Sequence, residues 1–144
     1  MVVVVAAQHR INGGITMAVS RVINHEAYSS VTLNNDISVI QTVNPIVESG
    51  LVRPIALGSA FVTGGAAVGS GWGQTSNPGS AAVELQFVGV AAITNEDCRS
   101  RLSVTQAARI FETTICSLSP TGSGMCMGDS GTIFEQPVQH FSNI

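Results

Sequence analysis

The residues best suited to chemistry lie near the end of the chain, where Gly128-Asp129-Ser130-Gly131 follows two residues after Cys126. Glycines beside a serine let backbone N–H groups approach a bound carbonyl group without a Cβ in the way. The N–H groups of Gly128 and Ser130 could then stabilise the oxyanion of a tetrahedral intermediate, at about 3–4 kcal/mol per donor in measured enzymes. The pattern predicts acyl transfer with Ser130 as the nucleophile. The alternative is a plain Gly/Ser turn.

The elements that must position this serine are mostly β-strands, because apolar and polar residues alternate along much of the chain. Alternation or a short apolar run predicts strands over 2–6, 15–23, 36–43, 83–87 and 113–118. Clusters of Gly, Asn and Pro between them predict turns. One helix is predicted near Thr94 and Asn95, either of which can cap it, and Leu102 or Ala107 could continue it or begin a second turn.

Many short strands, regular turns and one short helix predict an all-β protein built as an antiparallel barrel or sandwich. The Pro54–Leu57 segment is the predicted junction between two packed units, over 1–57 and 58–131. The Val2–Ala6 run predicts a strand buried on both sides. The Val2–Val5 part of this run is uncharged and β-branched, so in isolation it is a predicted aggregation site.

Composition excludes several classes of function. The 144 residues are 44% hydrophobic and 10% charged, and nine acids against six bases give a net charge of −3. All six bases are arginines and they form no cluster, so nucleic-acid binding is not expected. The apolar Met1–Ala7 run is far too short to span a bilayer. No metal-ligand cluster or dinucleotide fingerprint is present, so neither a metal nor a cofactor is expected.

Several motifs occur together in the order and with the spacing of one protease family. Cys126–Gly131 reads Cys-Met-Gly-Asp-Ser-Gly and resembles the nucleophile segment of the chymotrypsin-like serine proteases. Asn34–Ile40 resembles the family's Asn-Asp-Ile-Ala-Leu-Leu segment, and Gly71–Gln74 its Gly-Trp-Gly. His25–Tyr28 is similar to its His-Pro-x-Tyr, and Thr114–Cys116 to the strand before the nucleophile. The resemblance implies a chymotrypsin-like double antiparallel β-barrel that is truncated, with part of the first barrel and most of the second.

The resemblance also implies roles for single residues. Ser130 is the implied nucleophile, Asp36 the carboxylate that orients the base, and the N–H groups of Gly128 and Ser130 the oxyanion hole. Gly124 stands at the implied floor of the specificity pocket, where trypsin-like members carry an aspartate, and Met127 at its lip. An apolar, chymotrypsin-like preference is therefore implied. In the family, the residue matching Asp129 pairs with an amino terminus that zymogen cleavage creates.

The catalytic base is the main departure from the family pattern. His9 follows two alanines as the family's histidine does, but a glutamine intervenes and too few residues separate it from Asp36. His25 matches a non-catalytic position and His140 lies in a segment without a match. Residues 132–144 form an atypical tail. A serine without a base is a poor nucleophile at neutral pH, so the chain alone is expected to be an inactive fragment.

The three cysteines agree with this interpretation. Cys98 and Cys116 match a family disulfide, whereas the residue matching Cys126 bonds to a cysteine further along the family's chain. A free, buried Cys126 is the alternative. The resemblance implies a secreted serine endopeptidase whose partners are protein or peptide substrates and protease inhibitors.

Two other hypotheses belong to different classes. One is a non-catalytic serine protease homologue that acts as a binding module, and the other is an unrelated all-β binding domain. An α/β-hydrolase is not expected, because the serine lacks the Gly-x-Ser-x-Gly spacing and no alternation of strands and helices surrounds it.

Overall fold

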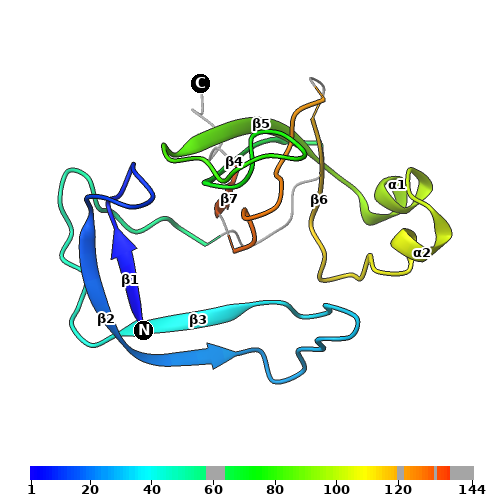
Figure 1. Cartoon of the computed structure of the whole chain (residues 1–144). Coiled ribbons are helices and arrows are strands. Elements are labelled where there is room, and N and C mark those ends of the chain that lie inside the picture. The colour runs from blue at the N-terminus through cyan, green and yellow to red at the C-terminus, as the bar shows by residue number, and fades with distance from the viewer. Residues whose placement is uncertain (58–63, 120–121, 132, 137–144) are drawn as a thin grey trace, which may run out of the picture. The chain divides into compact units, whose positions relative to one another are not determined.

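The computed structural model of the chain describes all residues except 58–63, 120–121, 132 and 137–144. The chain divides into two compact units, which we call unit 1 (Met1–Phe61 and Val83–Leu85) and unit 2 (Val62–Ala82 and Gln86–Ile144). Each unit carries one antiparallel sheet, and the helices are few and short (Figure 1). This architecture confirms the predicted all-β class and the truncated double β-barrel.

Unit 1 contains a three-stranded meander in the order β1 (Val2–Val5), β2 (Ile15–Asn24) and β3 (Ser38–Thr42). The first half of β2 pairs with β1 and its second half with β3, and the strand bends between the two (Figure 1). A register shift between Val19 and Arg21 lies at this change of partner, as expected where an extra residue bends a strand. The alternation over 15–23 thus predicted β2 to within one residue.

Two predictions for unit 1 are wrong in detail. The first strand is not buried on both sides, because Val2 and Val4 are 57% and 48% exposed, and only β2 pairs with β1 among the described strands. The third strand begins at Ser38 rather than at residue 36, so Asp36 lies in the turn before it.

The Val83–Leu85 segment joins unit 1 instead of beginning a strand of unit 2. The Leu85 N–H donates to the Gln8 carbonyl oxygen at 2.7 Å, and the Arg10 N–H donates to the Val83 carbonyl oxygen at 2.8 Å. The strand predicted over 83–87 therefore begins only at Gln86. Alternation could not separate the two parts, because both are extended and only their hydrogen-bond partners differ.

Unit 2 contains a four-stranded sheet in the order β6-β5-β4-β7, with every neighbouring pair antiparallel. The strands are β4 (Ala66–Gly71), β5 (Gln86–Ile93), β6 (Cys116–Leu118) and β7 (Ile133–Glu135). Among the described residues, the buried hydrophobic side chains all lie in this unit, and they are Ala67, Val90, Ala92 and Cys116. The described core of unit 2 is therefore small and made of short side chains.

Two short helices follow β5, where one was predicted: α1 (Asn95–Ser100) and α2 (Val104–Ala107). Thr94 caps α1 as predicted, since its Oγ1 accepts a hydrogen bond from the Asp97 N–H at 3.0 Å. The first helix ends at Ser100, and Ser103 is the N-cap of α2, where its N–H donates to the Gln106 Oε1 at 3.2 Å.

Candidate active site

The segment from Cys126 to Gly131, which we call the nucleophile loop, is built around a tight turn. The Asp129 N–H donates to the Cys126 carbonyl oxygen at 3.1 Å. Gly128 and Gly131 have φ angles of +95° and +80°, which L side chains rarely adopt. These two glycines therefore let the chain turn on both sides of Ser130, whose side chain is exposed.

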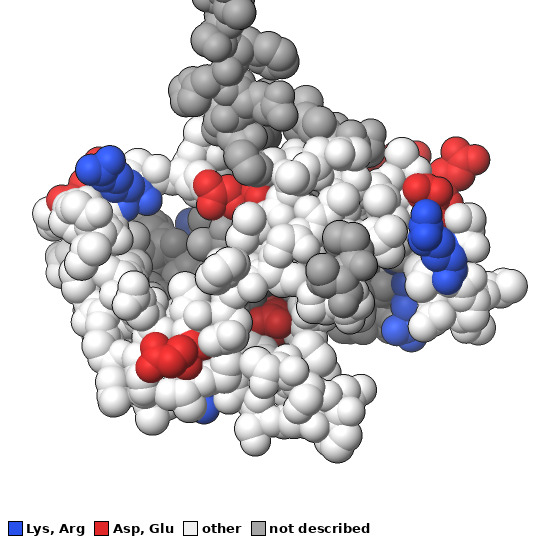
Figure 2. Space-filling model, turned by 90° about the horizontal axis from the view of Figure 1, so that it is seen from above, with Lys and Arg blue, Asp and Glu red and all other residues white. Residues whose placement is uncertain are grey.

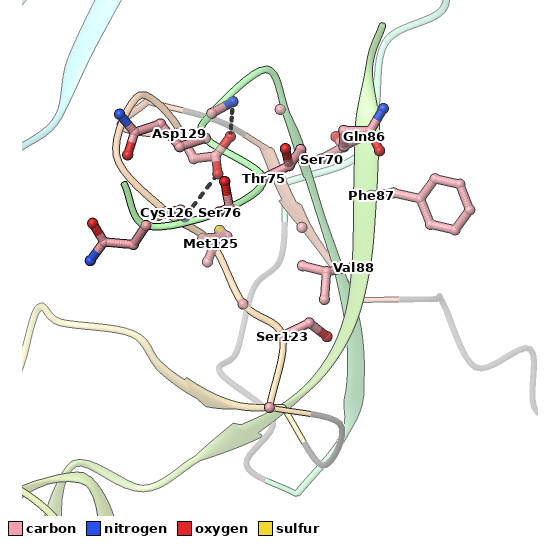
Figure 3. A pocket seen from close by; sticks show the side chains of 17 residues that line it. Ser70, Thr75, Ser76, Gln86, Phe87, Val88, Ser123, Met125, Cys126 and Asp129 are labelled. Atoms are coloured by element: carbon pink, nitrogen blue, oxygen red, sulfur yellow. Dashed lines mark hydrogen bonds between the residues drawn. The ribbon is translucent and has the colours of Figure 1, made fainter. Parts of the chain in front are cut away.

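The half-buried Asp129 carboxylate ties this loop to the segment that follows β4. Its Oδ1 accepts a hydrogen bond from the Gly73 N–H at 2.7 Å, and its Oδ2 accepts one from the Cys126 N–H at 2.9 Å (Figure 3). A third bond runs from the Gln74 N–H to the Met127 carbonyl oxygen at 2.9 Å. Bonds to an ionised acceptor are stronger than neutral ones, so the two bonds to Asp129 contribute most to restraining the loop.

The two N–H groups expected to form the oxyanion hole make no hydrogen bond within the described part of the chain. Neither the Gly128 N–H nor the Ser130 N–H donates to a described acceptor. Both residues are exposed. These donors are therefore available to a ligand next to Ser130, which is the requirement for stabilising an oxyanion.

A cavity of about 340 Å³ opens in unit 2 beside the nucleophile loop (Figure 3). It is lined by β4 and the segment after it, by the start of β5 and by the approach to the loop, over residues 69–71, 73–77, 86–88, 122–126 and 129. Gly124 lines the cavity, and its assignment to a pocket floor stays a prediction. Met127 does not line it and is 70% exposed, so its assignment to a pocket lip stays a prediction.

The cavity wall combines neutral polar and apolar groups. Ser70, Gln86, Val88 and Met125 line it, whereas the Phe87 side chain points away from it (Figure 3). Asp129 is the only charged residue among the described lining residues, and backbone N–H groups bind both of its oxygens. The described wall thus offers no free charge to a ligand.

Asp36 belongs to unit 1, in a turn whose backbone is held on both sides of it. The Asn35 Nδ2 donates to the Ala27 carbonyl oxygen at 3.0 Å, and the His25 N–H donates to the Ile37 carbonyl oxygen at 3.0 Å. Asn35 has a φ of +56°, a conformation that asparagine tolerates better than most residues. The Asp36 carboxylate itself is exposed and has no hydrogen bond or ion pair to any described residue.

No described histidine forms a hydrogen bond or ion pair with Asp36. The Nδ1 of His9 accepts a hydrogen bond from the Ile11 N–H at 3.3 Å, and the Nδ1 of His25 accepts one from the Ala27 N–H at 3.1 Å. These are local backbone contacts, which shape turns rather than support a base. His140 lies outside the described residues.

The described residues outside this site show no metal-binding group and no membrane-spanning helix. On the face that Figure 2 shows, several acidic and basic side chains lie next to one another near the edges, and no extended basic patch is visible. No group of three metal-ligating side chains occurs among the described residues. No described helix has the length and apolar composition to cross a membrane.

Sequence reasoning missed the residues that complete the site around the loop. Gly73 binds Asp129, and Ser70, Gln86 and Met125 line the cavity. Gly73, the second glycine of Gly-Trp-Gly, could have indicated this contact from the sequence, because a glycine often marks a close approach of the backbone to another group. The other three residues carry no motif, since their roles depend on which strands are neighbours.

Comparison of the sequence with known proteins identifies the family of the chain. A family model described as Trypsin matches residues 1–132. Trypsin alpha-3 of Lucilia cuprina is 36% identical over 83% of this chain and 72% of its own length, and Trypsin delta of Drosophila erecta is 38% identical over 83% and 47%. The chain spans about half the length of most of the curated relatives that it matches.

The same likeness extends to the fold. The crystal structure of a scabies mite inactivated protease paralogue superposes with a TM-score of 0.85, at 19% identity, over 94% of this chain and 60% of that one. At this identity the match concerns the fold alone. The family model and the curated relatives decide the family: the chain belongs to the trypsin family of trypsin- and chymotrypsin-like serine proteases.

Proposed function

We propose that the chain carries the nucleophile, the oxyanion hole and part of the specificity pocket of a secreted serine endopeptidase. The observation that carries the proposal is made in the nucleophile loop. The N–H groups of Gly128 and Ser130 have no described acceptor there, and Ser130 is exposed. Ser130 is the proposed nucleophile, Gly128 and Ser130 supply the oxyanion donors, and Asp36 is the proposed orienting carboxylate.

The reaction follows from these roles. The Ser130 Oγ forms a bond to the scissile carbonyl carbon, and its proton passes through a general base to the leaving amine as the C–N bond breaks. Water then hydrolyses the acyl-enzyme and regenerates the hydroxyl. No described histidine is bound to Asp36, so we propose that the base is missing from the chain as given and that the chain alone is inactive.

The preferred substrate is proposed to have an apolar side chain at the cleaved bond, as in chymotrypsin-like members. Gly124 brings no charge to the cavity, and the Asp129 carboxylate is already bound by Gly73 and Cys126. A basic substrate side chain would find no free partner charge in the described wall, and burying an unpaired charge is costly. Proteins and peptides are the proposed substrates, and protease inhibitors the proposed further partners.

A chimera tests the proposal. Residues 1–131 replace the matching segment of a complete trypsin-family protease, which supplies the base and the remaining pocket wall. We expect hydrolysis of chromogenic peptides, with a loss of about 10⁶-fold in kcat for Ser130→Ala, as for other serine nucleophiles. A folded chimera whose activity is unchanged by Ser130→Ala contradicts the proposal. The isolated chain is expected to turn over no more substrate than its Ser130→Ala variant.

A non-catalytic homologue that binds partners is the second candidate. The observation in its favour is the Asp36 carboxylate, which has no hydrogen-bond partner within the described residues. An inactive but folded chimera with the base present favours this candidate. A chimera that hydrolyses peptides excludes the non-catalytic homologue, because such a homologue carries no working nucleophile.

A further inference from the structure

Gly73 faces the nucleophile loop at a distance that leaves no room for a side chain. Gly73 is buried, its N–H donates to the Asp129 Oδ1 at 2.7 Å, and its Cα lies 3.3 Å from where a Cβ on Gly128 would stand. The next residue, Gln74, donates its N–H to the Met127 carbonyl oxygen. Two consecutive residues after β4 thus contact three consecutive residues of the loop, Met127, Gly128 and Asp129.

A Cβ at position 73 would collide with a specific group. It would lie 2.6 Å from the Asp129 Oδ1 and closer still to the Oδ2 and Cγ of the same carboxylate. Separations of this size do not occur between real Cβ atoms and their neighbours, so one of the two groups has to move. The carboxylate is the end of a side chain with rotatable bonds, whereas Gly73 is held in the backbone. The carboxylate would therefore be displaced.

Displacing the carboxylate would release both hydrogen bonds that it accepts. The Gly73 N–H and the Cys126 N–H would lose their acceptor together, because one carboxylate serves both. The Cys126 N–H lies at the start of the nucleophile loop and the Gly73 N–H outside it. Their common acceptor thus links the loop to the segment after β4, beside the bond from the Gln74 N–H to the Met127 carbonyl oxygen.

We propose that Gly73 is a positioning residue of the nucleophile loop, required because only a residue without a Cβ lets the Asp129 carboxylate bind the backbone at 73 and 126 at once. This inference deepens the proposed function and rests on it for its catalytic meaning. Its structural content, the coupling of Gly73 to the loop through Asp129, stands independently. Gly73 has no direct contact with the Ser130 hydroxyl in this proposal and acts on Ser130 indirectly, through the Asp129 carboxylate.

The reactivity of the Cys126 thiol can be used to test the coupling between Gly73 and the nucleophile loop in the unmodified chain. Cys98 and Cys116 are joined in a disulfide, so Cys126 is the free thiol among the chain's three cysteines. It is half-buried, and its own N–H is one of the two groups that Asp129 binds. The rate of alkylation by iodoacetamide without reductant, followed by mass spectrometry, therefore reports the accessibility of this thiol, which should rise when the loop opens.

We expect Gly73→Ala to raise the alkylation rate of Cys126 by about tenfold or more, where tenfold corresponds to about 1.4 kcal/mol in the opening equilibrium. Gly89→Ala is the matched control, because a Cβ on Gly89 meets nothing within 4 Å, and its rate should equal that of the unchanged chain. An unchanged rate in a folded Gly73→Ala chain overturns the proposal.

A double-mutant cycle separates this mechanism from general damage to unit 2. Asp129→Ala alone should also raise the rate, and Gly73→Ala in that background should add nothing, because the group that the Cβ displaces is already gone. Additive effects overturn the proposal.

If Gly73→Ala alone fails to fold, Gly73→Ala/Asp129→Ala must restore folding, since the collision is then removed. Failure of that rescue also overturns the proposal. No arm involves the Ser130 hydroxyl, so an inactive chimera refutes the proposed function without touching this result.

Discussion

The Arg99 guanidinium of α1 donates two hydrogen bonds to the backbone carbonyl oxygen of Ile110, from Nε at 3.2 Å and from Nη2 at 2.6 Å. Asn95 makes a similar contact, since its Nδ2 donates to the Phe111 carbonyl oxygen at 2.7 Å. Side chains of α1 thus hold the chain that returns toward β6. The disulfide Cys98–Cys116 closes the same segment, so covalent and polar links restrain it together.

Removing this disulfide should destabilise the chain without rearranging unit 2. The pair Cys98→Ala/Cys116→Ala is expected to lower the free energy of unfolding by about 3 kcal/mol, the chain-entropy value for a loop of this length. The sequence separation is 18 residues. Urea unfolding followed by Trp72 fluorescence measures the change. Cys126→Ala is the control, and an equal loss in that variant would show that the crosslink is not the cause.

The neighbouring glycines 13 and 14 offer a matched pair that separates backbone strain from steric overlap. Both have positive φ, +79° and +72°, so alanine at either position costs about 1–2 kcal/mol. A Cβ on Gly13 meets nothing within 4 Å, whereas one on Gly14 would lie 2.5 Å from the Val4 Cγ1 and 2.7 Å from the Val5 carbonyl oxygen.

Gly14→Ala should therefore be the more destabilising of the two by about 1–3 kcal/mol, the cost of overpacking. Hydrogen exchange of the β1 and β2 amides, read by mass spectrometry, reports the difference. Equal exchange in the two variants would contradict the close approach of residue 14 to β1.

The cap of α1 is predicted to contribute a measurable share of local stability. Thr94→Ala removes the oxygen that accepts from the Asp97 N–H and should cost about 1 kcal/mol, whereas Thr94→Ser keeps the acceptor and should cost little. Thermal unfolding by circular dichroism distinguishes the two. A loss of the same size in both variants would assign the effect to the threonine methyl group instead.

Asp36 is expected to matter for catalysis and not for folding. Its carboxylate is exposed and has no described partner, so Asp36→Asn should change the unfolding free energy by less than about 0.5 kcal/mol. In the chimera the same variant should lower kcat by about 10⁴-fold, because the base loses its orienting charge. Steady-state kinetics beside unfolding of the same samples checks both halves. A large loss of stability would indicate a structural role.

Gly124 should decide the charge preference of the cavity. A Cβ on Gly124 meets nothing within 4 Å, so Gly124→Asp can enter without collision. In the chimera this variant is expected to raise kcat/KM for arginine-containing peptides relative to phenylalanine-containing ones by at least about tenfold, through a new ion pair. Gly124→Asn, of the same shape without the charge, is the control. A shift of equal size in both variants would rule out electrostatic selection.

Local patterns in the sequence determined several elements directly. The alternation over 15–23 predicted β2, and Thr94, one of the two predicted caps, precedes α1. These predictions succeeded because alternation and capping act between residues close in the chain, and no distant partner overrides them. The glycines at 128 and 131 likewise indicated a backbone conformation that other residues rarely adopt, and their φ angles are +95° and +80°.

Only the tertiary structure decided which distant groups meet. Nothing local marks Ala66–Gly71 as a strand, since alanine and glycine are poor strand formers, yet pairing with β5 and β7 makes it one. The bond between Asp129 and Gly73 spans 56 residues and depends on where two loops end. A sequence specifies which residues could do chemistry. Their hydrogen-bond partners depend on chain segments that folding brings together, and that information is not local.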